Sequence, residues 1–473
     1  MPLIIPANTL VPSGYDVENS IRLDGSAYMH KTQSGGNRQI FTMSCWTKLT
    51  GAYGSNAGSL LSTDGTDDDS NFHFGVDNGG GSGGATDSLF LHIYGADGFT
   101  TTPFLRDYAA WYHVVLAVDT TQSTSSNRMK LYVNNVQQTL TEGSDYPAQN
   151  DNFGVNESGT VIGVGTHPGS VATYALNSYL AEYCLIDGLQ LTPSSFGEAN
   201  EDSPTIWQPI DVSGLTFGTN GFYLDFEDSA NLGNDANGGT DLTEVNLAAA
   251  DQATDTPTNN FCTLNPLLQA SDTTLSEGNL NYSDTNSNFK GVTGTIAVTS
   301  GKWYCETKVT TVGDAHQIGI VDVDQLAGAV AEHPGSQSRG WSLGNERDVY
   351  NNNGILSGYD DWTAAYGNGN IVGCALDLDN NKLYFSMDGE WSAGDGSWGS
   401  TTFNASTAAI PITGGYYYVF CNSAYNGVAS MNFGSPSYAN SSSVADENGY
   451  GDFEFAPPSG FYSLNTKNLA EYG

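Results

Sequence analysis

Basic residues are scarce in this 473-residue chain, which has 14 Lys and Arg against 52 Asp and Glu and a formal net charge of −38. A surface with this charge repels phosphate backbones and anionic membranes. No apolar run approaches the length that spans a bilayer. The sequence therefore predicts no nucleic-acid partner and no membrane insertion. Residues 1–6 lack the basic residues and the apolar length of a signal peptide, so we expect no secretion signal.

Cysteine is also scarce, with six residues and no Cys-x-x-Cys pair. Zinc sites usually contain such pairs, so the spacing argues against a zinc site. Disulfide scaffolds are much richer in cysteine. We therefore expect buried free thiols in a protein that folds in a reducing cytosol.

Helical periodicity is missing too, because no long segment repeats its apolar residues at helical spacing. Glycine, in contrast, occurs 57 times, and Asn, Ser, Thr and Asp are abundant. This composition is typical of many short strands joined by turns. The length leaves room for roughly two or three domains with separate cores. The sequence predicts an all-β protein.

One hairpin is present twice, as an apolar strand ending in Asp, a polar turn, and a strand beginning Lys-Leu-Tyr. The two copies span residues 114–134 and 372–387. Because side chains alternate along a strand, we expect Leu131 and Leu383 in a core and Tyr132 and Tyr384 facing outward. The repeat predicts two tandem β-sandwiches of related design. That organisation favours a binding or structural role over a single catalytic cleft.

A second repeat marks the domain ends: PTNNFCTLN at 257–265 and PPSGFYSLN at 457–465 share Pro, Phe and Leu-Asn at the same spacing. We interpret it as a reused junction whose Phe461 and Leu464 dock on another surface. The N-terminal arm is Pro-rich, and its Ile4 and Ile5 are further candidates for subunit docking. The predicted organisation is an arm at 1–14, sandwiches at 15–247 and 266–437, a junction at 248–265 and a tail at 438–473.

Two family resemblances follow from these segments. Residues 15–200 resemble laminin-G-like, concanavalin A-like sandwiches; the segments that carry the likeness are SIRLDG (20–25), FTMSCW (41–46), WYHVV (111–115), YVNN (132–135) and LAEYCLIDG (180–188) with PSSFG (193–197). Residues 266–435 resemble a SPRY domain through GKWYCE (301–306), IGI (318–320) and the hairpin at 376–391. The resemblance implies two tandem concanavalin A-like β-sandwiches with extended terminal segments. The arm at 2–8 and the Phe-x-x-Leu-Asn junctions are similar to those of phage tail-fibre-like proteins.

Hydrolases that share the concanavalin-like fold place paired carboxylates on one strand as Glu-x-Asp-x-x-Glu, because retaining hydrolysis needs an acid and a nucleophile. The sequence contains no such run, nor a Ser-His-Asp elbow. We therefore expect a protein that is not an enzyme. A calcium ion is the one cofactor candidate, since Asp64, Asp67 and Asp69 offer hard oxygens. A solvated acidic turn is the alternative explanation for these residues.

Sugar-binding sites combine a stacking ring with Asn or Asp side chains. This mixture occurs in the presumed loops of the second sandwich, where SPRY domains carry their variable loops. The predicted ligand-binding residues are Trp341, Tyr350, Asn351, Asn353, Tyr359, Asp361, Trp362 and Tyr366. Simple loop packing is the alternative role for these aromatic rings.

Together, the resemblances imply a phage virion surface protein, a tail fibre or similar appendage, that binds a host-surface glycan or receptor through its sandwich loops. The expected partners are other virion proteins, host polysaccharide and further copies of the chain, with a trimer favoured. The expected location is the virion surface, after synthesis in the host cytoplasm. The alternative is a decoration or head-fibre protein without glycan binding. A glycan hydrolase is a third, less favoured hypothesis.

Overall fold

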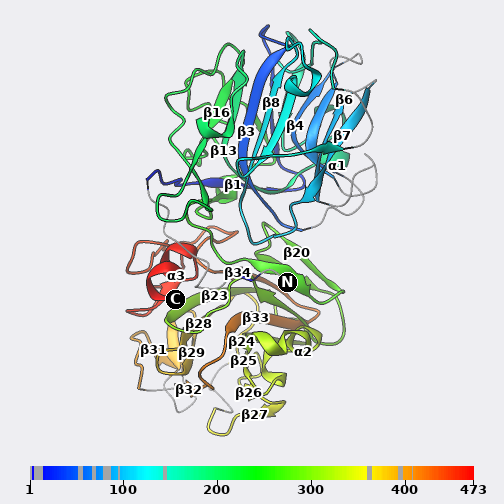
Figure 1. The fold of residues 1–473 in the computed structure, drawn as a ribbon. Coiled ribbons are helices and arrows are strands. Elements are labelled where there is room, and N and C mark those ends of the chain that lie inside the picture. The colour runs from blue at the N-terminus through cyan, green and yellow to red at the C-terminus, as the bar shows by residue number, and fades with distance from the viewer. Residues whose placement is uncertain are drawn as a thin grey trace. The chain divides into compact units, whose positions relative to one another are not determined.

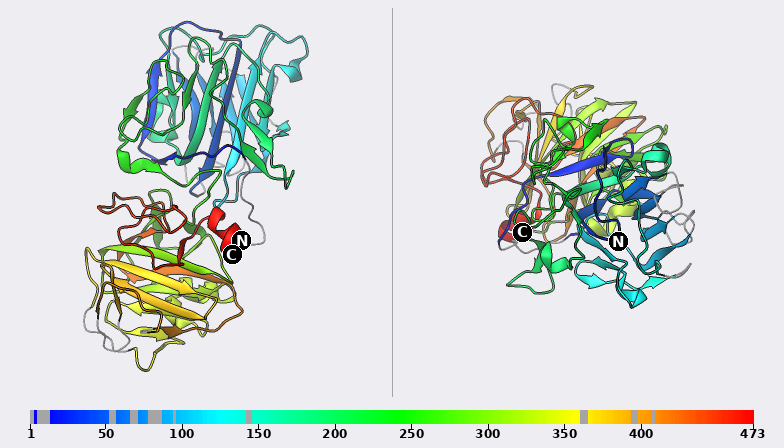
Figure 2. Two further views of the ribbon diagram at one scale, coloured as in Figure 1. Left: turned by 90° about the vertical axis from the view of Figure 1, so that its left-hand side faces the viewer. Right: turned by 90° about the horizontal axis from the view of Figure 1, so that it is seen from above.

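Antiparallel β-sheets form the framework of the protein, as Figure 1 shows in ribbon form and Figure 2 from two further directions. The structure, a computed structural model, describes residues 3–4, 14–51, 57–65, 71–77, 87–93, 96–141, 146–359, 365–392, 398–406 and 409–473. The all-β prediction is confirmed. The helices in the described part of the chain are short: α1 (Val171–Tyr174), α2 (Leu326–Ala331) and α3 (Thr466–Tyr472). None of the described helices has the length and apolarity needed to cross a bilayer.

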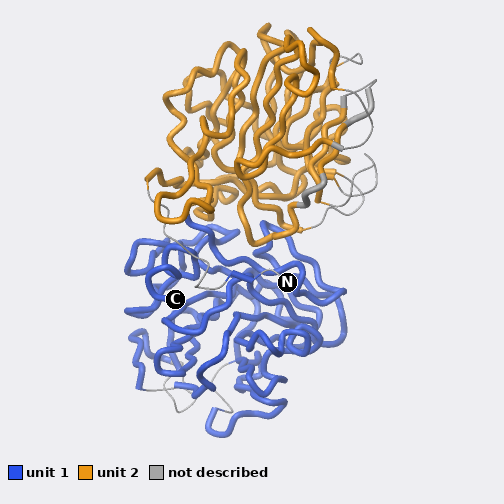
Figure 3. Tube along the Cα trace, viewed as in Figure 1, with its two compact units in different colours: residues 1–11, 259–473 blue, residues 12–258 orange. Residues whose placement is uncertain are grey.

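The chain divides into two compact units, coloured orange and blue in Figure 3. The N-terminal unit comprises residues 12–258, and the C-terminal unit comprises residues 259–473 together with 1–11. The division falls inside the expected junction at 248–265. Of the described residues, 3–4 of the arm and the tail at 438–473 belong to the C-terminal unit, whereas residue 14 of the arm belongs to the N-terminal unit.

The N-terminal unit is a sandwich of two eight-stranded sheets. In spatial order, the first sheet contains β10 (Val136–Gln137), β9 (Met129–Val133), β8 (Tyr112–Asp119), β3 (Ile40–Leu49), β13 (Asn177–Asp187), β1 (Ser20–Asp24) and β18 (Gln252–Ala253), with β16 (Phe222–Leu224) also paired to β13. The second contains β11 (Leu140–Thr141), β7 (Ala96–Phe104), β6 (Ser88–Ile93), β5 (Phe72–Val76), β4 (Gly58–Asp64), β12 (Val161–Val164), β2 (Tyr28–Thr32) and β17 (Thr243–Val245). A separate ribbon joins β14 (Gly197–Ala199) to β15 (Trp207–Pro209). The inward side chains of both large sheets form one apolar core.

The C-terminal unit pairs a seven-stranded sheet with a ten-stranded one. The first contains β19 (Leu264–Gln269), β22 (Lys290–Gly294), β33 (Tyr418–Tyr425), β24 (Ala315–Asp322), β25 (Gly340–Gly344), β26 (Val349–Asn351) and β27 (Gly354–Ile355). The second contains β20 (Thr273–Ser276), β21 (Asn281–Asp284), β34 (Val428–Asn432), β23 (Lys302–Thr311), β28 (Ile371–Asp377), β29 (Lys382–Met387), β30 (Glu390–Ser392) and β31 (Trp398–Ser400), while β32 (Ile410–Pro411) pairs with β29 and β35 (Tyr462–Ser463) with β23. Their facing side chains form the second core.

Both predicted hairpins are present, as β8–β9 and β28–β29. Leu131 and Leu383 are buried in the two cores, as predicted. Tyr384 lies on the opposite face but is only 2% exposed, because Phe403 and Phe461 cover it. The expected outward position is therefore correct for the strand face, and the expected solvent contact is wrong.

The outer face of the first sheet is also covered, by residues before β1 and by the chain from β18 onward. Lys48 and Asp255, both buried, form an ion pair of 2.7 Å between Nζ and Oδ2. Trp111 Nε1 donates to the other carboxylate oxygen at 3.0 Å, and Ser20 Oγ donates to the Asp255 carbonyl at 2.6 Å. A buried charge is costly unless it is paired and hydrogen-bonded, so this arrangement fixes the covering segment in one register.

We expect Asp255→Ala to destabilise the N-terminal unit by about 3–5 kcal/mol, because Lys48 would remain buried without its counter-charge. The measurement is chemical unfolding of the intact chain with hydrogen exchange of β3 and β13 amides. The matched control is Asp272→Ala, which removes an exposed pair with Lys290 at 3.9 Å and should cost less than about 1 kcal/mol. Equal losses in the two variants would contradict the anchoring role.

Candidate functional site

An open pocket of about 620 Å³ lies at one loop end of the N-terminal sandwich. Its walls come from the β2–β3 connection, the end of β13 and the turn before β16. The residues lining it are Gly36, Asn37, Arg38, Gln39, Asn152, Asp187, Gly188, Gly218 and Thr219. We call it the Asp187 pocket. Its volume is within the range of about 300–1,000 Å³ that is usual for ligand sites.

The Asp187 carboxylate is held rigidly at the base of the pocket, where the residue is 8% exposed. Its Oδ1 accepts the Asn37 N–H at 2.8 Å, and its Oδ2 accepts the Asn220 N–H at 3.1 Å. The Asn220 side chain is itself fixed by the Ser34 backbone and hydroxyl. Such pre-organised polar groups are suited to binding a ligand without loss of side-chain entropy.

Gly36 allows the backbone to lie close to the Asp187 carboxylate and the Asn220 side chain. A Cβ at Gly36 would lie 2.3 Å from Asp187 Oδ2 and 2.6 Å from Asn220 Nδ2, closer than any side chain tolerates. Gly218, with a φ of +80°, packs equally closely against the Asp187 carbonyl. The carboxylate therefore depends on two glycines for its position.

Arg38 contributes a guanidinium to the wall of the pocket. Its Nη1 is 2.9 Å from Glu157 Oε1, and its Nε donates to the Phe153 carbonyl at 2.7 Å. The Arg38 side chain is still 28% exposed. A planar guanidinium fixed in this way presents its remaining N–H groups in a defined direction.

The amides of the pocket are oriented by internal hydrogen bonds. Asn37 Oδ1 accepts the N–H groups of Gln39 and Ile40, both at 3.0 Å, and Asn152 Oδ1 accepts from Gln39 Nε2 at 3.2 Å. These bonds fix which end of each Asn amide accepts internally, and the NH₂ end remains a donor. The pocket thus offers carboxylate acceptors beside amide and guanidinium donors, a set that suits a ligand rich in hydroxyl groups.

The aromatic ligand site predicted in the C-terminal unit is not assembled as expected. Trp341 and Tyr366 are 4% and 3% exposed and belong to the core, which leaves them no surface for a ligand. The Tyr366 hydroxyl donates to the carbonyls of His316 and Leu343 at 2.7 and 3.2 Å. These two assignments are wrong, because an aromatic ring in a segment whose sequence is typical of loops can still pack in a core.

The half-buried members of the predicted set are occupied by internal contacts. Tyr350 Oη donates to Glu346 at 3.1 Å, and Tyr359 Oη donates to the Ala409 carbonyl at 2.6 Å. Asn351 Nδ2 donates to the Gly340 carbonyl at 2.9 Å and so ties β26 to the start of β25. Asn353 is exposed in a tight turn, with a φ of +60°. Asp361 and Trp362 lie outside the described residues.

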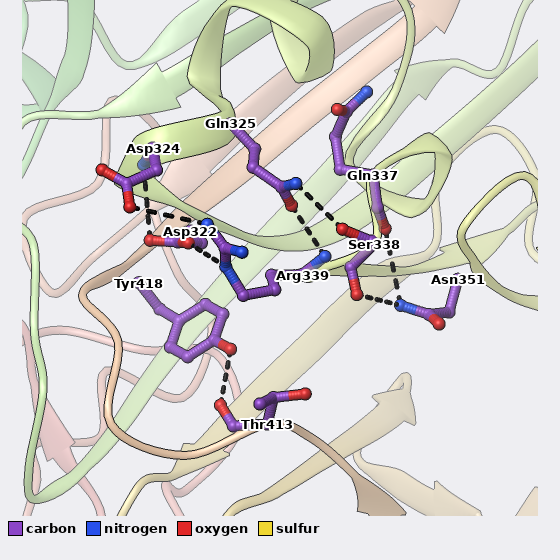
Figure 4. A network of polar contacts seen from close by, with 9 residues as sticks. All are labelled: Asp322, Asp324, Gln325, Gln337, Ser338, Arg339, Asn351, Thr413 and Tyr418. Carbon is purple, nitrogen blue, oxygen red and sulfur yellow. Dashed lines mark hydrogen bonds and ion pairs between the residues drawn. The ribbon is translucent and has the colours of Figure 1, made fainter.

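Arg339, which the sequence did not single out, organises the polar network around Asn351 (Figure 4). Its Nε bonds the buried Asp322 carboxylate, and its Nη2 lies 3.5 Å from Asp324. Its guanidinium carbon is 4.4 Å from the centroid of the Tyr416 ring. The contacts compensate the Arg339 charge, so this rim presents a rigid surface rather than an open charged site.

Of the three carboxylates predicted to bind calcium, Asp64 lies among the described residues. Asp64, at the end of β4, is exposed and packs against Gly169. Asp67 and Asp69 lie outside the described residues. Within the described part of the chain, no three His, Cys, Asp or Glu side chains are grouped for a metal ion. The calcium site stays a prediction.

The predicted subunit-docking residues contact their own chain. Phe461 and Leu464 are 2% and 0% exposed in the C-terminal unit. Ile4 adds a bridge beside Ile296, with its N–H 3.0 Å from the Thr295 carbonyl. Ile5 lies outside the described residues. The three described side chains pack on apolar surfaces of the C-terminal unit of their own chain, and docking to another subunit stays a prediction.

Among the buried carboxyl groups with raised pKa values, Glu182 and Glu306 have the largest shifts, and neither residue lines the pocket. Burial raises the pKa of Glu182 to about 8, with further contributions from neighbouring acids. Glu182 sits in a β-bulge of β13 with a φ of +49°, and Tyr223 Oη contacts its two oxygens at 2.9 and 2.8 Å. Burial likewise raises the pKa of Glu306 to about 7, and this residue accepts the N–H groups of Glu454 and Phe455. Both act in holding the layers together.

Sequence reasoning missed the Asp187 pocket because its parts are far apart in the chain. Residues 36–39, Asn152, Asp187 and residues 218–219 meet only in the folded sandwich. Asp187 lies in the segment 180–188, which resembles laminin-G-like sandwiches, but the sequence indicated only that it ends a strand. No local pattern in the sequence links these residues.

Residues 23–176 match the family model described as the concanavalin A-like lectin/glucanases superfamily. The N-terminal unit contains a concanavalin A-like domain. No curated protein matches the chain in sequence.

Solved structures with a similar fold include a candidate carbohydrate-binding protein from Bacteroides ovatus, with 18% identity over 50% of this chain and 60% of that one and a TM-score of 0.37. This chain thus spans less than two thirds of that protein. The human HERC1 SPRY domain has 13% identity over 36% of this chain and 96% of that one, with a TM-score of 0.26. A Limulus polyphemus pentraxin has 15% identity over 38% and 80%, with a TM-score of 0.28. These likenesses carry no functional argument.

We expect Phe461→Ala to lower the stability of the C-terminal unit by about 3–5 kcal/mol without changing the oligomeric state, because Phe461 fills an intramolecular site. Unfolding curves and light scattering of the eluted protein measure the two quantities. The control is Leu267→Ala, since Leu267 is 49% exposed and its loss should change stability by less than about 0.5 kcal/mol. A changed mass with unchanged stability would show that Phe461 docks between subunits.

We expect Glu182→Gln to remove a pH-dependent loss of stability. The pKa of Glu182 is raised on folding, so its contribution to stability is complete below about 4.5 and is lost as the pH rises through about 8. The difference in free energy of unfolding between wild type and variant should change by several kcal/mol as the pH rises, at about 1.4 kcal/mol per pKa unit. This difference should become constant above pH 8. Thermal unfolding of both proteins from pH 5 to 9 tests this, with the exposed Glu201→Gln as control. A constant difference across this range would contradict it.

Proposed function

We propose that this protein is a phage virion surface protein that binds a host-surface glycan through the Asp187 pocket. Glycan binding is supported by the pocket itself, an open site lined by a fixed carboxylate, two Asn side chains with oriented amides and a guanidinium. Sugar hydroxyls both donate and accept hydrogen bonds, so they match this set of groups. The family match over residues 23–176 supports a carbohydrate ligand for the same unit.

The virion setting rests on the sequence resemblance of the arm and the Phe-x-x-Leu-Asn junctions to phage tail-fibre-like proteins. The protein would act as a tail fibre or similar appendage, assembled with other virion proteins and with its own copies. Cryo-electron microscopy of purified particles tests this part. Absence of the chain from the particle would refute it.

Glycan binding separates this proposal from a purely structural decoration protein. We expect Gly36→Ala to weaken binding of host-envelope polysaccharide at least about tenfold, because the new Cβ displaces Asp187, and one lost hydrogen bond to a charged group is worth about 1.5–3 kcal/mol. Surface plasmon resonance with the intact protein measures the affinity.

The matched control is the neighbouring Gly35→Ala. A Cβ at Gly35 would meet only Ser158 Cβ at 3.8 Å, an ordinary van der Waals contact. This variant should therefore bind like wild type. Equal affinity of all three proteins would place binding elsewhere, and no binding by wild type would favour a decoration role.

A further inference from the structure

The charges of the Asp187 pocket point to a particular class of glycan. Arg38 and Asp187 are the charged residues among those that line the pocket. Arg38 is neutralised by Glu157 at 2.9 Å. Asp187 has no cationic partner among the lining residues after this pairing, so the site is locally anionic. Around it is a chain with a formal net charge of −38.

Hydrogen-bonding capacity leads in the same direction. The oriented amides of Asn37 and Asn152 donate, and the free oxygen of Gln39 and the remaining lone pairs of Asp187 accept. A sugar hydroxyl can use a donor and an acceptor together. A carboxylate or sulfate group only accepts, and it would lie beside the Asp187 charge in a field that repels it.

The pocket also lacks a stacking platform, since none of its lining residues is aromatic. Binding must then rely on hydrogen bonds, each worth only about 0.5–1.5 kcal/mol net. A single site of this kind is weak, and useful affinity requires several sites acting on one polymer. A repeating host polysaccharide provides such a ligand.

We propose, as a refinement that rests on the proposed function, that the Asp187 pocket selects neutral, hydroxyl-rich glycan units and rejects acidic ones. Selection comes from Asp187, whose carboxylate accepts hydroxyl protons and repels anionic groups. Arg38 contributes directed donors without a net positive charge. Binding is therefore polar but insensitive to salt.

The test is a glycan array carrying neutral and uronate- or sialate-containing oligosaccharides, probed with the intact protein at 0.15 M salt. We expect neutral glycans to bind at least about tenfold more strongly than acidic ones, with less than a twofold change between 0.05 and 0.5 M salt. Equal or stronger binding of acidic glycans, or steep loss of binding with salt, would overturn the selectivity while leaving glycan binding intact. No binding to either class would overturn the proposed function itself.

Two variants localise the effect. Asp187→Asn should weaken the binding of neutral glycans about tenfold and reduce the difference in affinity between neutral and acidic glycans. Asp202→Asn makes the same charge change at an exposed residue outside the pocket and should alter neither affinity. Because Asp187 is buried, Asn152→Ala serves as a second variant on an exposed wall residue, and it should also weaken neutral glycans. Unchanged binding in Asn152→Ala and Asp187→Asn would overturn the assignment to this pocket.

Discussion

The buried ion pair of Lys48 and Asp255 shows the constraint on which the N-terminal sandwich depends. A sheet buries one face against its partner, but here the outer face also carries large apolar side chains, among them Trp46, Trp111 and Tyr179. These rings are covered by a third layer that includes Val17, Ala253 and Trp207. Asp255 binds this layer to the sheet through Lys48 and Trp111. The charge pair thus gives an otherwise non-directional apolar cover a single register.

The C-terminal unit solves the same problem with a different anchor. Glu306 projects from β23 and accepts N–H groups from Glu454 and Phe455, which brings the tail over Tyr304 and Tyr384. The repeated junctions then meet each other: Phe261 forms an antiparallel bridge with Asn465, and the Cys262 N–H donates to the Leu464 carbonyl at 2.9 Å. The repeat is therefore a pair of matching ends that closes this unit.

Strand positions, both hairpins and the all-β class could be predicted from the sequence, because alternation along a strand is a local property. What covers a strand face is a long-range property. Tyr384 and Trp341 show this difference, since the first was placed on the right face and is covered by the tail, and the second fills the core. The candidate pocket was beyond prediction for the same reason. The position of the Asp187 carboxylate depends on Gly36 and Asn220, which lie far from it in sequence.

The two loop regions differ in a way that bears on function. In the C-terminal unit, the polar groups of Tyr350, Tyr359 and Arg339 bond to other groups of the same unit. The rim is therefore rigid, and most of its hydrogen-bonding groups are paired. In the Asp187 pocket, each Asp187 oxygen accepts one backbone N–H, which leaves further lone pairs, and the Arg38 side chain stays 28% exposed. A polar network whose groups are all paired internally stabilises a surface. A network whose groups keep donors and acceptors available can also bind a polar ligand. The pocket, which the aromatic pattern did not indicate, is thus the better site for a polar ligand.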